Sequence, residues 1–305
     1  MIKSSIRLLS VWSTFFRYPS YKESRLGAVL WYNWFATIGL LLASRGIPPP
    51  NLVGRTLAVT TLITVFVYIL NDVMDADIDR LNPTKSNRPI PSGLASKKEA
   101  LSLSLLCGVL GLFFGFSTNT LVGFFASLYM ILGVLYSTPP IRLKNKFLMK
   151  ELVLGLGLLI SVLLGGSFIG FVSIITLFAG IFLFISAIVF YPTFEDAMDV
   201  EEDRLDGCKT LAMILEQKKR LELTIIGVIF IMVITPFTYL HFGLNTICPI
   251  IICVACLLFL RYLFPLLFTS NERIINEILG RGRTFVRLFV LVIQIGFIIG
   301  SLELL

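Results

Sequence analysis

Charged residues are scarce in this chain of 305 residues: Asp, Glu, Lys and Arg together account for 15%, and hydrophobic residues for 56%. Soluble domains average about a quarter charged residues. The mean hydropathy of the chain is +0.88. These values exclude an ordinary soluble domain, and they predict an integral membrane protein.

Histidine and cysteine are also rare, with one His and five Cys. The number of cysteines is odd and four of them lie in apolar runs, so no disulfide framework is indicated. Cys253 and Cys256 form a CxxC pair in an apolar run without His or further Cys, which favours packing over metal binding. His241 lies in the last residues of the apolar run 223–242, at the end away from the acidic residues described below, and we interpret it as structural.

Apolar runs of the roughly 17 to 25 residues needed to cross a bilayer can be placed nine times. The nine predicted spans are Gly27–Ala43, Leu52–Leu70, Ala100–Phe116, Leu121–Ser137, Leu152–Ile169, Ile174–Tyr191, Leu223–Phe242, Ile247–Phe264 and Phe285–Leu302. An all-α membrane protein follows, because only helices of this length satisfy their own backbone groups in lipid.

Basic residues are absent from the connections between spans three and four, five and six, and seven and eight. They gather before the first span and in the connections after the second, fourth and sixth spans. The positive-inside rule therefore places the amino terminus and these basic connections in the cytoplasm, and the carboxyl terminus outside. The net charge of +7 thus reflects topology, and no nucleic acid partner is predicted.

Residues 1–25 mix apolar side chains such as Trp12 and Phe15 with basic ones such as Lys3 and Arg7. This composition is typical of an amphipathic helix lying in the headgroup region of a membrane. We expect the segment to anchor the chain at the membrane surface, and we favour this role over a direct part in a site.

All aspartates of the chain fall in two stretches that follow apolar runs. They are Asp72, Asp75, Asp77, Asp79, Asp196, Asp199, Asp203 and Asp206. Positions 72, 75 and 79 are spaced i, i+3 and i+7, so they share one face of a helix. Positions 196, 199 and 203 repeat this spacing, and an Arg follows each set. The repeat suggests two related helical halves whose acidic faces converge on one site.

Each acidic stretch is predicted to be a cytoplasmic connection, over residues 71–99 and 191–222. In the first, prolines from Pro83 onward prevent one continuous helix, and Lys85 and Arg88 follow the acids closely. Carboxylates beside cations suggest a polyanion held partly by direct charge and partly through a metal. A solvated loop that only fixes topology explains the cations but not the aspartates, since acids contribute little to topology.

Carboxylates without His or Cys ligands suit hard cations, and Mg²⁺ commonly bridges one or two carboxylates to substrate phosphates. Such a site at the membrane surface fits a substrate with a charged head and an apolar tail. A prenyl diphosphate has this shape.

The motifs Asn71-Asp72-x-x-Asp75-x-x-x-Asp79 and Asp196-x-x-Asp199-x-x-x-Asp203-x-x-x-Gly207-x-x-Thr210 resemble the two signatures of the UbiA superfamily of membrane prenyltransferases. Tyr136-Ser137 with Pro139-Pro140, and the run from Lys85 to Gly93, resemble that family too. Glu202 departs from the pattern, because family members often have Gly there, and Asp206 adds another acid. These departures concern the local backbone and leave the implied metal role unchanged.

The resemblance implies one membrane-embedded domain over residues 1–305, with nine helices around a central cavity and the active site at the cytoplasmic face. It implies Mg²⁺-dependent transfer of a prenyl group from a prenyl diphosphate to a lipophilic acceptor. The aromatic precursor of a quinone or haem and a glycerol-phosphate lipid both stay open as acceptors.

Carried over to this sequence, the resemblance assigns roles to single residues. One Mg²⁺ would bind Asp72, Asp75 and Asp79, and a second would bind Asp196, Asp199 and Asp203, with the diphosphate bridging both. Asn71, Lys85, Arg88, Arg142, Lys144 and Lys209 are candidate substrate-binding residues. Tyr136 is a candidate catalytic residue, through its ring face or its hydroxyl, although an interfacial aromatic residue fits its position nearly as well.

Two other classes of protein share some of these features. A secondary transporter also carries ionisable residues at membrane depth and internal repeats, but here the acids gather at one membrane face. A non-catalytic protein that binds prenyl lipids would show binding without turnover.

Overall fold

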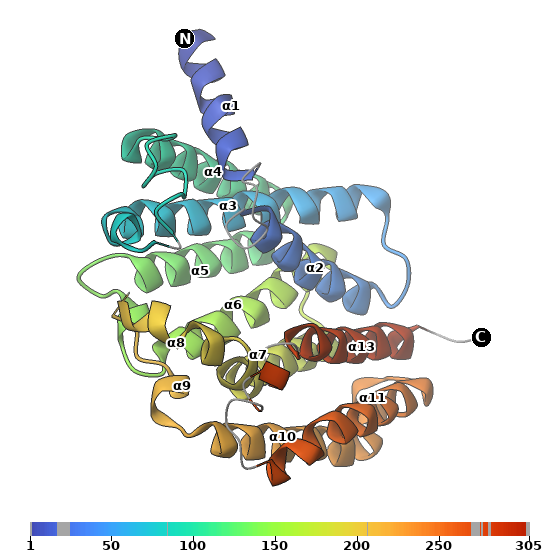
Figure 1. Cartoon of the computed structure of the whole chain (residues 1–305). Helices are drawn as coiled ribbons and strands as arrows, with labels where there is room; N and C mark the ends of the chain where they lie inside the picture. Colours follow the sequence, from blue (N-terminus) through green and yellow to red (C-terminus); the bar gives the residue numbers. More distant parts are fainter. Residues whose placement is uncertain are drawn as a thin grey trace. The chain divides into compact units, whose positions relative to one another are not determined.

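The computed structural model describes residues 2–16, 25–83, 85–205, 207–269, 275, 277–279 and 282–302. These residues are almost entirely helical (Figure 1) and contain no β-strand. Nine of their helices are long and apolar enough to cross a membrane, which confirms the predicted number of spans. The chain forms two compact units, described separately here.

Unit 1 comprises residues 1–40, 48–144 and 160–171. It contains α1 (Ile2–Phe16), most of α2 (Arg25–Ser44), α3 (Pro50–Leu81), α4 (Lys97–Thr118), α5 (Thr120–Ser137) and the last turns of α6 (Met149–Gly166), with the 3₁₀ turn η2 (Ser167–Ile169). Helices α3, α4 and α5 pack pairwise against one another (Figure 1).

The core of unit 1 is built mainly on the apolar face of α3. Phe66 and Ile69 of α3 pack with Leu103 of α4, and Val11 and Phe15 of α1 are buried in the same cluster. Segment 1–25 is thus helical over Ile2–Phe16 and packs on unit 1. Its position at the membrane surface stays a prediction, and Met1 and residues 17–24 lie outside the described residues.

Two glycines let α2 and the end of α6 come into backbone contact. A Cβ on Gly39 would lie 1.9 Å from the carbonyl oxygen of Val162, and one on Gly165 would lie 1.8 Å from that of Ala36. No side chain fits at either distance, so this contact requires glycine on both helices.

The first acidic stretch is helical rather than a loop. Helix α3 continues to Leu81, beyond the predicted end of the span at Leu70, because the residues after Leu70 include no helix breaker before Pro83. The connection that follows is residues 82–96, shorter than the predicted loop 71–99. Ser96 then begins α4 with a capping box, in which its side chain and that of Glu99 satisfy each other's backbone N–H groups.

Unit 2 comprises residues 41–47, 145–159 and 172–305. It contains the start of α6, α7 (Ile174–Phe194), α8 (Asp196–Leu205), α9 (Leu211–Ile214), α10 (Gln217–Thr238), α11 (Ile247–Leu263) and α13 (Arg283–Ser301), with the 3₁₀ turns η3 (Tyr239–Phe242) and η4 (Phe264–Phe268). Aromatic side chains join three of these helices: Phe190 of α7 and Phe289 of α13 both pack against Phe259 of α11.

The second acidic stretch is also mostly helical. Helix α7 passes through Pro192 and ends at Phe194, and α8 begins at Asp196. The predicted loop 191–222 is therefore replaced by the end of α7, the short helices α8 and α9, and the first turn of α10. Each unit carries one copy of the repeated acidic spacing.

Candidate active site

The first acidic cluster consists of Asp72, Asp75 and Asp79 on α3, and all three are buried. Their spacing predicts this, because residues i, i+3 and i+7 share one helix face. Asp77 points away from that face, where its carboxylate pairs with Lys97 in an exposed ion pair of 2.7 Å. The structure thus separates three functional candidates from one surface residue within two turns of helix.

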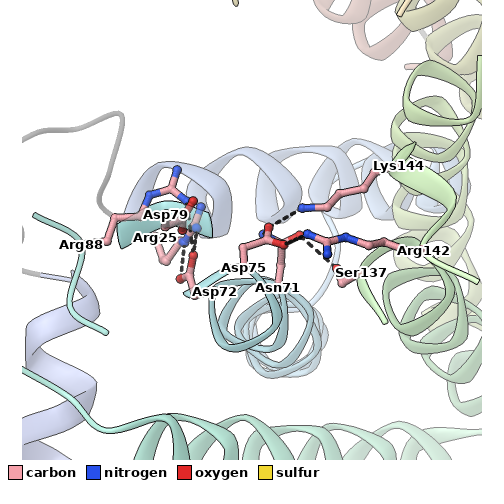
Figure 2. A network of polar contacts seen from close by, with 9 residues as sticks. All are labelled: Arg25, Asn71, Asp72, Asp75, Asp79, Arg88, Ser137, Arg142 and Lys144. Carbon is pink, nitrogen blue, oxygen red and sulfur yellow. Dashed lines mark hydrogen bonds and ion pairs between the residues drawn. The ribbon is translucent and has the colours of Figure 1, made fainter. Parts of the chain in front are cut away.

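Cationic side chains from three other segments meet the buried carboxylates. Arg25, at the start of α2, donates from Nε to Oδ2 of Asp72 at 2.8 Å and from a second nitrogen to Oδ1. Arg88, in the connection after α3, lies 2.9 Å from Asp79 and 3.8 Å from Asp72. Figure 2 shows these four side chains together on one side of the cluster.

Asp75 has its own partners on the other side of the cluster (Figure 2). Arg142 donates to its Oδ1 at 2.7 Å. Lys144, in the 3₁₀ turn η1 (Leu143–Asn145), donates to its Oδ2. Asn71 also donates to Oδ2, at 2.9 Å, and accepts a hydrogen bond from Ser137 at the end of α5. The segment after α5 is thus fastened to α3 through Asp75.

The backbone at Arg142 is strained. Its φ is 34°, in the left-handed region that non-glycine residues seldom adopt. Its N–H bonds to the carbonyl of Thr138 at 2.9 Å, while its guanidinium holds Asp75. Strain of this kind costs about 1–3 kcal/mol and is found most often at functional sites.

The second acidic cluster in unit 2 is organised by Lys150, near the start of α6. Its ammonium lies 2.8 Å from Asp196 and 2.6 Å from Asp203, so it bridges the two ends of the acidic face of α8. Burial raises the pKa of Asp196 to about 6, and Lys150 opposes that shift. The other carboxylate oxygen of Asp196, Oδ2, is buried without a hydrogen-bond partner.

The neighbouring Glu151 supports the same region of unit 2. It is fully buried, and its Oε1 accepts the backbone N–H of Leu211 at 2.7 Å, at the first residue of α9. Arg220 of α10 donates to the carbonyl oxygen of Pro192, the last turn of α7 before Asp196. Residues on α6 and α10 therefore fix the segments on both sides of α8.

Several predicted residues have a less defined place. Lys85 is half-buried in the turn after α3, Lys209 is exposed, and Tyr136 is half-buried on α5 beside Ser137. Their roles stay predictions. The side chains of Asp199 and Glu202, and all of Asp206, lie outside the described residues.

Sequence reasoning missed Arg25, Lys150 and Glu151 as members of the acidic sites. Arg25 and Lys150 each precede a predicted span by two residues, and basic residues in such positions are interpreted from sequence as signals of topology. A charged residue in the first turn of a span is ambiguous in sequence, since it either faces the headgroups or reaches a buried acid. Only the packing of α2 and α6 decides between these positions.

The residues suit a hard divalent metal. Among the described residues, no three His, Cys, Asp or Glu side chains gather closely enough to hold a metal by themselves. Mg²⁺ does not require this, because it usually takes one or two carboxylates with water and substrate phosphate. The acidic donors are all oxygen atoms, and Oδ2 of Asp196 is a buried acceptor without a partner. The assignment of three aspartates to each ion stays a prediction.

Comparison with known proteins agrees with the fold and the motifs. A model of the UbiA prenyltransferase family matches residues 32–278. Digeranylgeranylglyceryl phosphate synthase of Sulfurisphaera tokodaii is 29% identical over 88% of this chain and 92% of its own. The enzyme of that name from Methanosarcina mazei is 30% identical over 77% of this chain and 84% of its own. A UbiA homologue from Archaeoglobus fulgidus, solved bound to DMAPP and Mg²⁺, matches with a TM-score of 0.62 and 19% identity over 90% of this chain and 97% of its own.

Proposed function

This chain belongs to the UbiA prenyltransferase family, and we propose that it transfers a geranylgeranyl group from its diphosphate to a glyceryl phosphate lipid. The chain is a multi-pass membrane prenyltransferase. Two relatives that match most of it are named for digeranylgeranylglyceryl phosphate. A product with two such chains forms by alkylation of a glyceryl phosphate that already carries one.

The buried acidic face of α3 is the observation that carries this proposal. Asp72, Asp75 and Asp79 are each less than 6% exposed, at the end of a helix that is largely apolar before them. Burial of three carboxylates is costly unless cations or metals compensate it. A surface that combines buried acids with Arg and Lys suits a metal-bound diphosphate better than a neutral ligand.

The roles of the residues follow from their charge. Asp72, Asp75 and Asp79 would hold one Mg²⁺, and Asp196, Asp199 and Asp203 a second, with the donor diphosphate between the ions. Bound Mg²⁺ would neutralise charge on the diphosphate as it leaves. Arg88, Arg142 and Lys144 would donate hydrogen bonds to diphosphate oxygens, and their charge favours the leaving group in the transition state.

Further residues complete the proposed site. Asn71 orients Asp75 through its hydrogen bond, and Lys85 and Lys209 are further candidates for contact with phosphate. Tyr136 would present its ring face to the allylic cation or its hydroxyl to the diphosphate. The acceptor hydroxyl then forms the ether bond to the allylic carbon as the bond from that carbon to diphosphate oxygen breaks, and the hydroxyl proton passes to a base or to water.

The orientation in the membrane is part of the proposal. Basic residues cluster in the connections after the second, fourth and sixth spans, and both acidic stretches adjoin such connections. The positive-inside rule supports a cytoplasmic amino terminus and a cytoplasmic site. A cytoplasmic site suits a water-soluble diphosphate head whose apolar tail stays in the bilayer.

The test is a product assay with purified protein in detergent. We expect labelled geranylgeranyl diphosphate and geranylgeranylglyceryl phosphate, with Mg²⁺, to yield diphosphate and a doubly prenylated lipid, detected by mass spectrometry. EDTA should stop the reaction and excess Mg²⁺ should restore it. Aromatic acceptors serve as the comparison. Turnover with aromatic acceptors alone would show that the acceptor is aromatic and not a glyceryl phosphate lipid. Binding of the donor without transfer to any acceptor would favour a transporter or a prenyl-lipid binding protein.

A further inference from the structure

The first acidic cluster contains more positive than negative charge. Three carboxylates, those of Asp72, Asp75 and Asp79, are paired with four cations, those of Arg25, Arg88, Arg142 and Lys144. None of these seven side chains is more than 18% exposed. The charges therefore act on one another with less screening than charges at a water-exposed surface.

The ion pairs use the same carboxylate oxygens that a metal would need. Arg25 takes both oxygens of Asp72. Arg142 and Lys144 each donate a hydrogen bond to one oxygen of Asp75, and Arg88 donates to Oδ2 of Asp79. A divalent ion that enters alone competes with a cation for these oxygens, and it adds charge to a cluster that is already positive. Both effects oppose binding of the ion by itself.

A diphosphate reverses this balance. It brings several negative charges, and its oxygens bind Mg²⁺ as well as Arg and Lys side chains. A guanidinium that leaves a carboxylate then finds a phosphate oxygen as its new partner. In the second cluster the ammonium of Lys150 lies against both Asp196 and Asp203.

We propose that the first acidic cluster takes up its divalent metal only together with a diphosphate, and that Arg25 is the positioning residue that enforces this order. This inference rests on the proposed function. Arg25 occupies both oxygens of a predicted metal ligand, through a forked contact with Asp72. Its guanidinium also lies 5.4 Å from the ring centroid of Tyr68, one turn earlier on α3. Arg88 lies 3.8 Å from Asp72, so this carboxylate keeps a cation nearby when Arg25 moves.

Equilibrium dialysis of Mn²⁺ against the purified full-length protein tests this order. The Asp196→Asn/Asp203→Asn variant isolates the first cluster, and geranylgeranyl thiolodiphosphate serves as a donor analogue that resists ionisation. We expect the analogue to tighten Mn²⁺ binding by roughly 5- to 150-fold, the usual range for coupling between two ligands. Linkage requires Mn²⁺ to tighten binding of the analogue by the same factor. Equal Mn²⁺ affinity with and without the analogue, or no Mn²⁺ binding in either case, would overturn the inference.

Substitution of Arg25 in the same background tests its part. Arg25→Gln should tighten Mn²⁺ binding without the analogue by roughly tenfold, and so reduce the coupling. Lys97→Gln is the matched control, since it removes a cation whose ammonium pairs with the exposed Asp77 and not with the buried acids, and its coupling should equal that of the parent. Unchanged Mn²⁺ affinity in folded Arg25→Gln would exclude Arg25 as the enforcing residue. If Arg25→Gln does not fold, dialysis of the parent still decides the order of binding.

Product formation by wild-type protein separates this inference from the proposed function. Prenyl transfer together with equal Mn²⁺ affinities would refute the order of binding alone. Absence of transfer to any acceptor would refute the proposed function, whatever the dialysis shows.

Discussion

Asp75 and Asp77 lie two positions apart on α3 and have opposite surroundings. Asp75 is buried among Asn71, Arg142 and Lys144, whereas the side chain of Asp77 is 74% exposed. The sequence predicts this difference, because the helical period turns position 77 away from the face shared by positions 72, 75 and 79. It does not predict the partners of each acid, which come from segments far away in the chain.

The pair provides a matched test of which acids act in the reaction. Asp75→Asn should lower turnover by about 100-fold or more, because it removes a charged ligand whose contribution to transition-state charge is several kcal/mol. Asp77→Asn should retain turnover near that of wild type, since an exposed ion pair is screened by water and contributes little. Initial rates of diphosphate release measure both. Equal losses in the two variants would show that the buried face has no special role.

At the scale of single elements, the apolar runs predicted all nine spans but not their ends. Helix α3 passes through its aspartates because cations from other segments compensate their burial, and hydropathy does not register that compensation. The capping box at Ser96 and Glu99 is visible in the sequence and gives the start of α4 more closely than hydropathy does. Pro192 falls inside α7, one residue beyond the predicted end of the sixth span at Tyr191.

The attachment of α8 to α6 through Lys150 predicts a large effect on stability. Lys150→Met leaves Asp196 and Asp203 buried without their shared ammonium, and loss of one partner from a buried ion pair costs about 3–5 kcal/mol. We expect a lower melting temperature in detergent, measured by intrinsic fluorescence. Lys146→Met changes an exposed lysine of the same connection and should leave the melting temperature unchanged. Equal melting temperatures for the two variants would contradict a structural role for the bridge.

The backbone contact between α2 and α6 in unit 1 predicts a second effect on stability. Gly165→Ala places a Cβ 1.8 Å from the carbonyl oxygen of Ala36, so the helices must separate, at a cost of about 1–3 kcal/mol or more. Gly54→Ala is the control, because nothing lies within 4 Å of its added Cβ and alanine is the better helix former. In thermal unfolding, Gly165→Ala should lower the melting temperature and Gly54→Ala should keep or raise it. Equal melting temperatures would show that the contact tolerates a side chain.

At the scale of the whole molecule, the repeated acidic spacing predicted two related halves. The structure has two compact units, with Asp72 in one and Asp196 in the other. The sequence does not predict which basic residues join each acidic cluster, because Arg25 and Lys150 reach their carboxylates through helix packing. That both clusters act on one donor diphosphate stays a prediction from the repeat and from the family.

A double-mutant cycle on turnover tests this central claim most directly. Asp75→Asn, Asp196→Asn and the double variant are compared by release of diphosphate from labelled geranylgeranyl diphosphate in the presence of acceptor and Mg²⁺. Residues that act as a unit show strongly non-additive losses. We predict that each single variant turns over about 100-fold or more slowly than wild type. The turnover of the double variant should be at most about tenfold below that of the less active single variant. Losses that multiply in the double variant, or wild-type turnover in either single variant, would contradict the shared use of one diphosphate.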